Sequence, residues 1–144
     1  MRTVLLAAVL LLSCVAVAHP DGAEPPNPRP SEVMMALDVT IVTTVSVEAL
    51  KRTFKEPRPV ASGSSGYAFP SGHATLAFAL APVAAEYHPK QRTLWYAIAA
   101  GVAWSRVHER AHDWDDVIAG AALGTLIGRR AVRDGGIVLV EAKW

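Results

Sequence analysis

Cysteine and net charge are both scarce in this sequence. Its only cysteine, Cys14, cannot form a disulfide within the chain or provide a zinc site built on several cysteines. The 14 Lys and Arg residues are balanced by 13 Asp and Glu residues, so the basic excess typical of nucleic-acid binding is missing, and we expect no nucleic-acid partner. Hydrophobic residues make up 51% and charged residues 19% of the chain, which excludes a disordered protein and is typical of one folded domain.

The first 18 residues have the composition of an export signal. Arg2 provides a positive start, Val4 to Leu12 is a short apolar run, and Ala16-Val17-Ala18 fits a small-x-small cleavage pattern. We therefore predict a signal peptide at residues 1–18 and an exported protein, periplasmic or extracellular. Its removal would take away one cation and no acid, so the mature chain would carry no formal net charge.

A second interpretation of the same stretch is lipidation. The residues Leu11-Leu12-Ser13-Cys14 resemble a bacterial lipobox, in which the cysteine is lipidated and becomes the new N-terminus, although Leu12 is not the usual residue there. The simplest alternative is that Cys14 only fills the apolar run. Residues 19–30 are rich in proline and predict an extended linker, which leaves residues 31–144 as the folded domain.

Four apolar segments after the linker predict an all-α fold, a compact helical bundle with its functional site at one end. Ser31 and Glu32 suit the start of the first helix, because one can cap it and the other places an acid in its first turn. The run from Ile137 to Val140 has β-type residues and is assigned to no element. The helices are expected at Ser31 to about Lys51, His73 to Tyr87, Thr93 to about Arg106, and Asp116 to Arg130.

The lengths of these segments favour a soluble or peripheral bundle that associates at most with a membrane surface. The last three apolar runs are about 12 to 15 residues long, below the roughly 20 that a bilayer requires. The first is longer but contains Asp38 and Glu48. Embedded helices stay an alternative, because basic residues between and after the last three segments also fit a positive-inside pattern.

Two clusters of basic or polar residues precede the second helix. Lys51 and Arg58 stand at the end of the first helix and in the following loop, where a solvated helix end is the simpler interpretation. The second cluster is Pro70-Ser71-Gly72-His73, directly before a helix. Ser71 can cap that helix, Gly72 lets a ligand approach the backbone, and the free amides of the helix start favour an anion.

The third cluster runs from Ser105-Arg106 to His112 and Asp116. His112 and Asp116 are four residues apart and would share one face of a helix. A carboxylate in that position can fix the tautomer of the imidazole and leave its other nitrogen free to attack. An exposed charged pair is the alternative, and a metal site of His108, His112 and Asp116 is a less favoured one. Together the clusters offer cations, helix-start amides and two histidines, which is what phosphoryl transfer requires.

The three clusters resemble the signature motifs of the type 2 phosphatidic acid phosphatase and vanadium haloperoxidase superfamily. Those motifs are Lys-x6-Arg-Pro, Pro-Ser-Gly-His and Ser-Arg-x5-His-x3-Asp, and this sequence has every specified position in that order. The motifs lie between Lys51 and Asp116, and the flanking helices extend the resemblance to about residues 31–131.

The resemblance implies a role for each motif residue. His112 would be the nucleophile that forms a phosphohistidine, Asp116 would orient it, and His73 would protonate the leaving alcohol and then activate water. No metal cofactor is implied, because cations neutralise the phosphate. The two histidines must be in opposite protonation states, which predicts a bell-shaped pH profile on the mildly acidic side. The implied phosphate-binding residues are Lys51, Arg58, Ser71, Gly72 and Arg106.

The resemblance therefore implies a metal-independent phosphatase, a phosphoric ester hydrolase acting on phosphomonoesters or on lipid phosphates and diphosphates. One alternative is a vanadium-dependent haloperoxidase, whose vanadate would occupy the same pocket. Another is a non-catalytic phosphate- or lipid-binding member, because membrane members usually have six spans and only four helices are expected here. A homo-oligomer could replace the missing packing. The residues Asp113-Trp114-Asp115 also stand where an aromatic residue followed by Pro-Ser is commoner.

Overall fold

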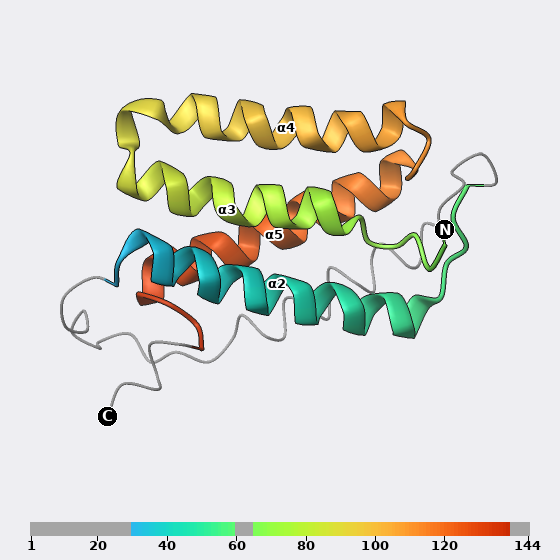
Figure 1. Cartoon of the computed structure of the whole chain (residues 1–144), viewed down its shortest axis with the longest axis horizontal. Coiled ribbons are helices and arrows are strands. Elements are labelled where there is room, and N and C mark those ends of the chain that lie inside the picture. Colours follow the sequence, from blue (N-terminus) through green and yellow to red (C-terminus); the bar gives the residue numbers. More distant parts are fainter. Residues whose placement is uncertain (1–29, 60–64, 139–144) are drawn as a thin grey trace.

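The computed structural model describes residues 30–59 and 65–138, and within these ranges the protein is helical and contains no strand (Figure 1). The expected all-α bundle is therefore confirmed. The predicted signal peptide, Cys14 and nearly all of the predicted linker lie outside the described residues. The helices are α2 (Glu32–Phe54), α3 (Gly72–Tyr87), α4 (Arg92–His108) and α5 (Trp114–Asp134), and a 3-10 turn, η2 (Pro89–Gln91), joins α3 to α4.

The helix ends follow from local chemistry. At the start of α2 the Ser31 hydroxyl accepts a hydrogen bond from the Met34 amide at 3.3 Å, as the sequence predicts. α5 begins two residues before the expected Asp116, because the Asp116 carboxylate accepts a hydrogen bond from the Asp113 amide at 3.2 Å and so caps the first turn. It ends at Asp134 and is followed by Gly135, whose φ of 76° suits a left-handed helix cap.

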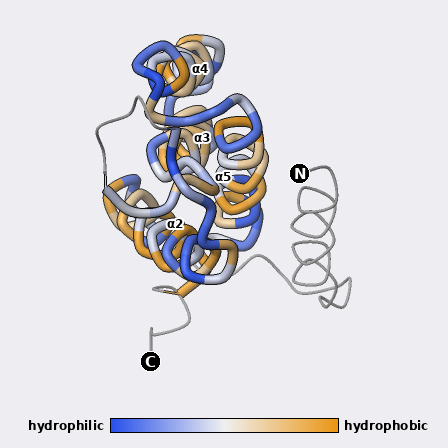
Figure 2. Tube along the Cα trace, turned by 90° about the vertical axis from the view of Figure 1, so that its right-hand side faces the viewer, coloured by the Kyte–Doolittle hydropathy of each residue, from blue (hydrophilic) through white to orange (hydrophobic). Residues whose placement is uncertain are grey.

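Helix α3 lies at the centre of the bundle and packs against the three other α-helices. Figure 1 shows α4 on one side of α3 and α2 on the other, with α5 crossing behind them. The end-on view of Figure 2 shows α4 and α2 at opposite edges. α2 and α3 run in opposite directions, so the end of α2 lies near the start of α3.

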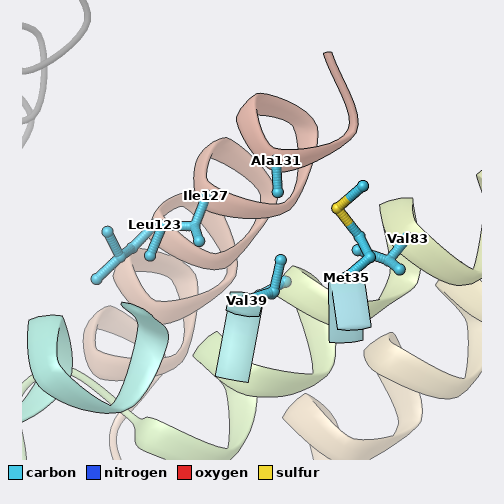
Figure 3. Packing of buried hydrophobic residues seen from close by; sticks show 7 residues of the cluster. Met35, Val39, Val83, Leu123, Ile127 and Ala131 are labelled. Carbon is cyan, nitrogen blue, oxygen red and sulfur yellow. The ribbon is translucent and has the colours of Figure 1, made fainter. Parts of the chain in front are cut away.

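The main hydrophobic core lies between α2, α3 and α5 (Figure 3). Its small and branched side chains leave little space between the helices, and Val39 and Ala131 have no exposed surface. A second, smaller cluster joins α4 to α3 and α5 through Ala74, Ala103 and Val117. The buried residues of the main core are Met35, Val39, Ala79, Val83, Leu123, Ile127 and Ala131.

Three glycines on one face of α5 allow its backbone to approach that of α3. A Cβ atom at Gly124 would lie 2.0 Å from the Thr75 carbonyl oxygen, and one at Gly128 would lie 2.2 Å from the Ala79 carbonyl oxygen. At Gly120 the distance to the nearest backbone atom would be 2.8 Å. No side chain fits at these positions without separating the helices, so the stripe of glycines fixes how closely α5 packs on α3.

The last described residues are held by a buried carboxylate. Asp38 on α2 is 1% exposed, and its oxygens accept hydrogen bonds from the backbone amides of Ile137 and Val138, the latter at 2.9 Å. A buried carboxyl group is costly unless it has such donors. These hydrogen bonds therefore hold Ile137 and Val138, the start of the run to which the sequence analysis assigned no element, against α2.

The outer face of α2 is apolar. Val33, Leu37, Ile41 and Val45 follow one another at four-residue spacing and are between 45% and 68% exposed. By length and composition α2 is also the one helix of the described ranges that is apolar enough to cross a membrane, a test that core helices of soluble proteins meet as well.

The glycine stripe predicts the effect of adding a single methyl group. We expect Gly124→Ala to lower the free energy of unfolding by about 3 kcal/mol, because the new methyl group meets backbone that cannot move aside. Gly101→Ala on α4 is the matched control, since a Cβ there meets nothing within 4 Å, and helix propensity should raise stability by up to about 1 kcal/mol. Denaturant unfolding of both variants checks this, and similar changes in the two would show that the stripe is not tightly packed.

Candidate active site

The three sequence motifs meet at one cavity of about 280 Å³, near the end of α2 and the starts of α3 and α5. Five of the eight predicted site residues line it: Lys51, Arg58, Gly72, His73 and His112. Within the described ranges, the complete lining consists of Thr43, Thr44, Val47, Glu48, Lys51, Arg58, Gly72, His73, Leu76 and His112.

His112 is buried and held from both ring nitrogens. Its Nδ1 lies 3.1 Å from Oδ2 of Asp116, and its Nε2 lies 3.3 Å from Nη1 of Arg58. A guanidinium can only donate, so Nε2 is the acceptor and Nδ1 carries the proton that is donated to Asp116. This arrangement selects the tautomer with the lone pair on Nε2, the atom nearest the predicted phosphate-binding cation.

His112 and Asp116 reach this contact in a way the sequence spacing did not predict. They do not share a helix, because α5 begins at Trp114 and His112 lies in the preceding loop. Asp116 is in the first turn of α5, where the helix dipole favours a negative charge. The backbone carbonyl of Asp116 also accepts a hydrogen bond from the Ser71 amide at 3.0 Å, which joins the second motif to the third.

Lys51 connects α2 to the loop that precedes α3. Its ammonium group donates to the carbonyl of Tyr67 at 2.6 Å, and the Ala68 carbonyl lies 3.4 Å away. The Phe69 ring packs edge-on against Phe54, with 5.3 Å between the ring centroids, and is 3% exposed. Phe69 therefore holds the loop down, whereas Tyr67 is 40% exposed.

Arg58 and Ser71 contain buried polar atoms without partners. Arg58 donates from Nη1 to the Ala111 carbonyl at 3.2 Å, but its Nε is buried and makes no hydrogen bond. Ser71 takes the N-cap position of α3, as expected, yet its hydroxyl does not cap the helix and is likewise unpartnered. Since buried polar groups normally have partners, both atoms are candidates to bind a ligand, although only Arg58 lines the cavity.

His73 stands in the first turn of α3 with its side chain on the cavity. Burial lowers the pKa of His73 below its usual value of 6.5, and the positive charges of Arg106 and Arg58 and the neighbouring His112 lower it further. The ring therefore loses its proton more readily than a free imidazole.

Glu56 gives the site a negative neighbour. Partial burial raises the pKa of Glu56, and the carboxylates of Asp116, Asp113 and Asp115 raise it further. Glu56 therefore holds its proton more readily than a free glutamate.

Arg106 is the one predicted phosphate-binding cation that does not line the cavity. Its Nη2 donates to Glu109 at 3.0 Å and its Nε donates to the Ser105 hydroxyl at 3.2 Å. Glu109 is 54% exposed, and such surface pairs contribute little stability. The contact with Glu109 is therefore weak enough for an anion in the cavity to replace it.

The three residues of the alternative metal site are not brought together as a ligand cluster. His108 stacks on Trp104, with 4.7 Å between the ring centroids. In the described part of the chain, no three His, Cys, Asp or Glu side chains come close enough together to hold a metal ion.

The cavity is also lined by four residues of α2 that do not belong to the motifs: Thr43, Thr44, Val47 and Glu48. Helical spacing could have found them, because positions three, four, seven and eight residues before Lys51 lie on its side of the helix. That inference would also have required knowing which neighbour this face meets.

Comparison with known proteins identifies a family, a relative and a similar fold. Residues 32–135 match the PAP2 superfamily. Over 91 residues, or 57% of the chain, the sequence is 36% identical to a lipid A 1-phosphatase from Porphyromonas gingivalis, of which it covers 19%. A transmembrane PAP2-type phosphatidylglycerolphosphate phosphatase from Bacillus subtilis has a similar fold, with a TM-score of 0.58 at 24% identity over 69% of this chain and 57% of that one.

The chain thus spans about a fifth of the length of the curated relative and little more than half of the solved structure. The family match is much more extensive, since it covers most of the chain and contains all three motifs. The expected resemblance is confirmed, and the chain belongs to the PAP2 superfamily.

Proposed function

We propose that this protein is a phosphatase that hydrolyses phosphate monoesters through a phosphohistidine on His112, with lipid phosphates or diphosphates as its substrate class. The observation that carries the proposal is the state of His112. Asp116 fixes its proton on Nδ1, and the lone pair of Nε2 stands beside Arg58 in a cavity that also contains Lys51 and His73.

In the first step Nε2 of His112 attacks phosphorus, so that a P–N bond forms and the P–O bond to the leaving alcohol breaks. Asp116 stabilises the positive charge that develops on the ring. His73 gives its proton to the leaving oxygen. In the second step His73 takes a proton from water, whose oxygen attacks phosphorus, and the P–N bond breaks to release phosphate and neutral His112.

The cations would neutralise the equatorial oxygens of the phosphoryl group without a metal ion. Arg58 would turn from Nε2 of His112 to the phosphate, where its planar fork suits two oxygens. The unpartnered hydroxyl of Ser71 and the amide of Gly72 supply further donors at the start of α3. Arg106 would exchange Glu109 for the phosphate.

Lipid substrates and a membrane-associated protein are supported by the relatives and by α2. Both relatives bear the names of phosphatases of lipid phosphates, and one of them is transmembrane. The apolar outer face of α2 suits contact with lipid. Export to the periplasm and the formation of a homo-oligomer stay predictions.

Removing the nucleophile tests the proposal directly. We expect His112→Ala to lower the rate of p-nitrophenyl phosphate hydrolysis on the order of 10³-fold or more, because no other group can form the covalent intermediate. EDTA should leave the wild-type rate unchanged. The matched control is His108→Ala, which removes an exposed histidine stacked on Trp104 and should keep full activity. Equal rates in wild type and His112→Ala, or loss of activity with EDTA, would contradict the proposal.

The lowered pKa of His73 predicts the alkaline side of the pH profile. His73 must be protonated to act as the acid, so kcat/KM for an alkyl phosphate should fall as the pH rises through a pKa below 6.5. Arg106→Gln removes a positive charge that lowers this pKa, so it should move the decline to higher pH while reducing the rate. Glu109→Gln removes a charge that raises the pKa and should move the decline to lower pH.

Rate profiles from pH 4 to 8 for the three proteins check these shifts. Movement of both variants in the same direction, or no movement in either, would show that the decline does not report His73.

A further inference from the structure

One hydroxyl group of α2 differs from all the others in that helix. The hydroxyls of Thr40, Thr44, Ser46 and Thr53 each donate to the carbonyl four residues earlier, at 2.7 to 2.8 Å. Thr43 is 1% exposed, and its hydroxyl makes no hydrogen bond. A buried hydroxyl in a helix normally donates to the carbonyl four residues earlier. The Thr43 hydroxyl lacks this hydrogen bond and is therefore available to another partner.

Two of the four unpartnered polar side chains in the described ranges, Thr43 and Arg58, line the catalytic cavity. In the described part of the chain, four buried side-chain polar atoms lack a hydrogen bond, and they belong to Thr43, Arg58, Ser71 and Trp95. Arg58 and Ser71 are predicted to bind phosphate, and Thr43 lines the same cavity as Arg58. Thr43 therefore shares with Arg58 both a position on the cavity and a buried polar atom that a bound substrate could satisfy.

Thr43 lines the part of the cavity that extends along α2 away from Lys51. It stands eight residues before Lys51, which is about 12 Å along the helix axis. On α3 the lining continues from His73 to Leu76, one turn further in. Because α2 and α3 run in opposite directions, these two series of residues extend the same way, from the proposed leaving-group acid toward the middle of the bundle.

The α2 wall of the cavity also carries groups that do not suit a phosphate. Glu48, three residues before Lys51, is exposed and places a carboxylate at the edge of this wall, where it repels phosphate and accepts hydrogen bonds from hydroxyl groups. The Thr43 hydroxyl can both donate and accept. Val47 and Leu76 supply apolar surface between them. A plain alkyl chain would leave Thr43 unsatisfied, whereas the hydroxyls of a polyol or a sugar would satisfy Thr43 and Glu48 together.

We propose that the cavity between α2 and α3 binds the leaving alcohol and selects a hydroxylated one, a polyol or sugar, through Thr43 and Glu48. The inference rests on the proposed phosphatase function and specifies the leaving alcohol, which that proposal did not define. The same polyol phosphate can be a free molecule or the headgroup of a lipid.

The test compares two esters of equal carbon number in the full-length protein, sn-glycerol 3-phosphate and n-propyl phosphate. We expect wild type to prefer the glycerol ester in kcat/KM, and Thr43→Val to lower that preference about five-fold, the loss expected for one neutral hydrogen bond. Thr43→Ser, which keeps the hydroxyl, should retain the preference. Phosphatidylglycerol phosphate in detergent micelles shows whether the headgroup form is hydrolysed faster than the free ester, and Thr43→Val should slow whichever form is preferred.

Two further variants separate recognition from folding. Thr40→Val makes the same substitution one turn earlier on α2, at a hydroxyl that already has a partner and does not line the cavity, and should leave the preference unchanged. Glu48→Ala changes an exposed residue, so it should fold normally and lower the preference. A preference for the propyl ester in wild type, or equal loss for both esters in Thr43→Val and in Glu48→Ala, would overturn the proposal.

Calorimetric binding of the same two esters keeps this test separate from that of the function. If wild type hydrolysed neither ester, the phosphatase proposal would fail, and tighter binding of the glycerol ester that is lost in Thr43→Val would still support the site. Equal binding of both esters by wild type would reject the site whether or not the protein is an enzyme.

Discussion

The direct contact between the backbones of α3 and α5 sets the geometry on which the rest of the structure depends. Gly124 and Gly128 bring the two helices to a separation that no side chain would permit, and the hydrogen bond from Ser71 to Asp116 continues the contact at the site. His73 is carried by α3, and His112 is held by the first turn of α5. The proposed in-line transfer needs its acid and nucleophile on opposite sides of one phosphorus atom. The glycines of α5 would then determine the spacing of His73 and His112 without contacting the substrate.

Much of this could be predicted from local sequence. The four helices follow from apolar segments bounded by Ser31, the Ser71-Gly72 pair and Pro89, and the middle of each helix lies in the range expected for it. The motif residues were recognisable because their order and spacing resemble the signature motifs of the family. The pairing of His112 with Asp116 was also predicted, although the reason was different, since the carboxylate both caps α5 and reaches the ring from within its first turn.

What could not be predicted depends on neighbours and on side-chain conformation. The glycines of α5 look like ordinary small residues until α3 is placed against them. Arg106 has the charge expected of a phosphate-binding residue, but its guanidinium donates to Glu109 in the structure. The spacing of residues in the sequence does not determine which acceptor this side chain contacts. Thr43 is one of five similar hydroxyls along α2, and only its missing bond to the helix backbone sets it apart.

The contact between Arg58 and Nε2 of His112 has a consequence for chemical selectivity. While the guanidinium donates to that lone pair, the nitrogen is less available to an electrophile in the cavity. Under the proposed mechanism, a dianionic ester would draw Arg58 to itself by charge and so release the lone pair of His112 when a phosphorus atom is beside it. Neutral electrophiles lack that attraction and meet a ring whose reactive nitrogen is already occupied.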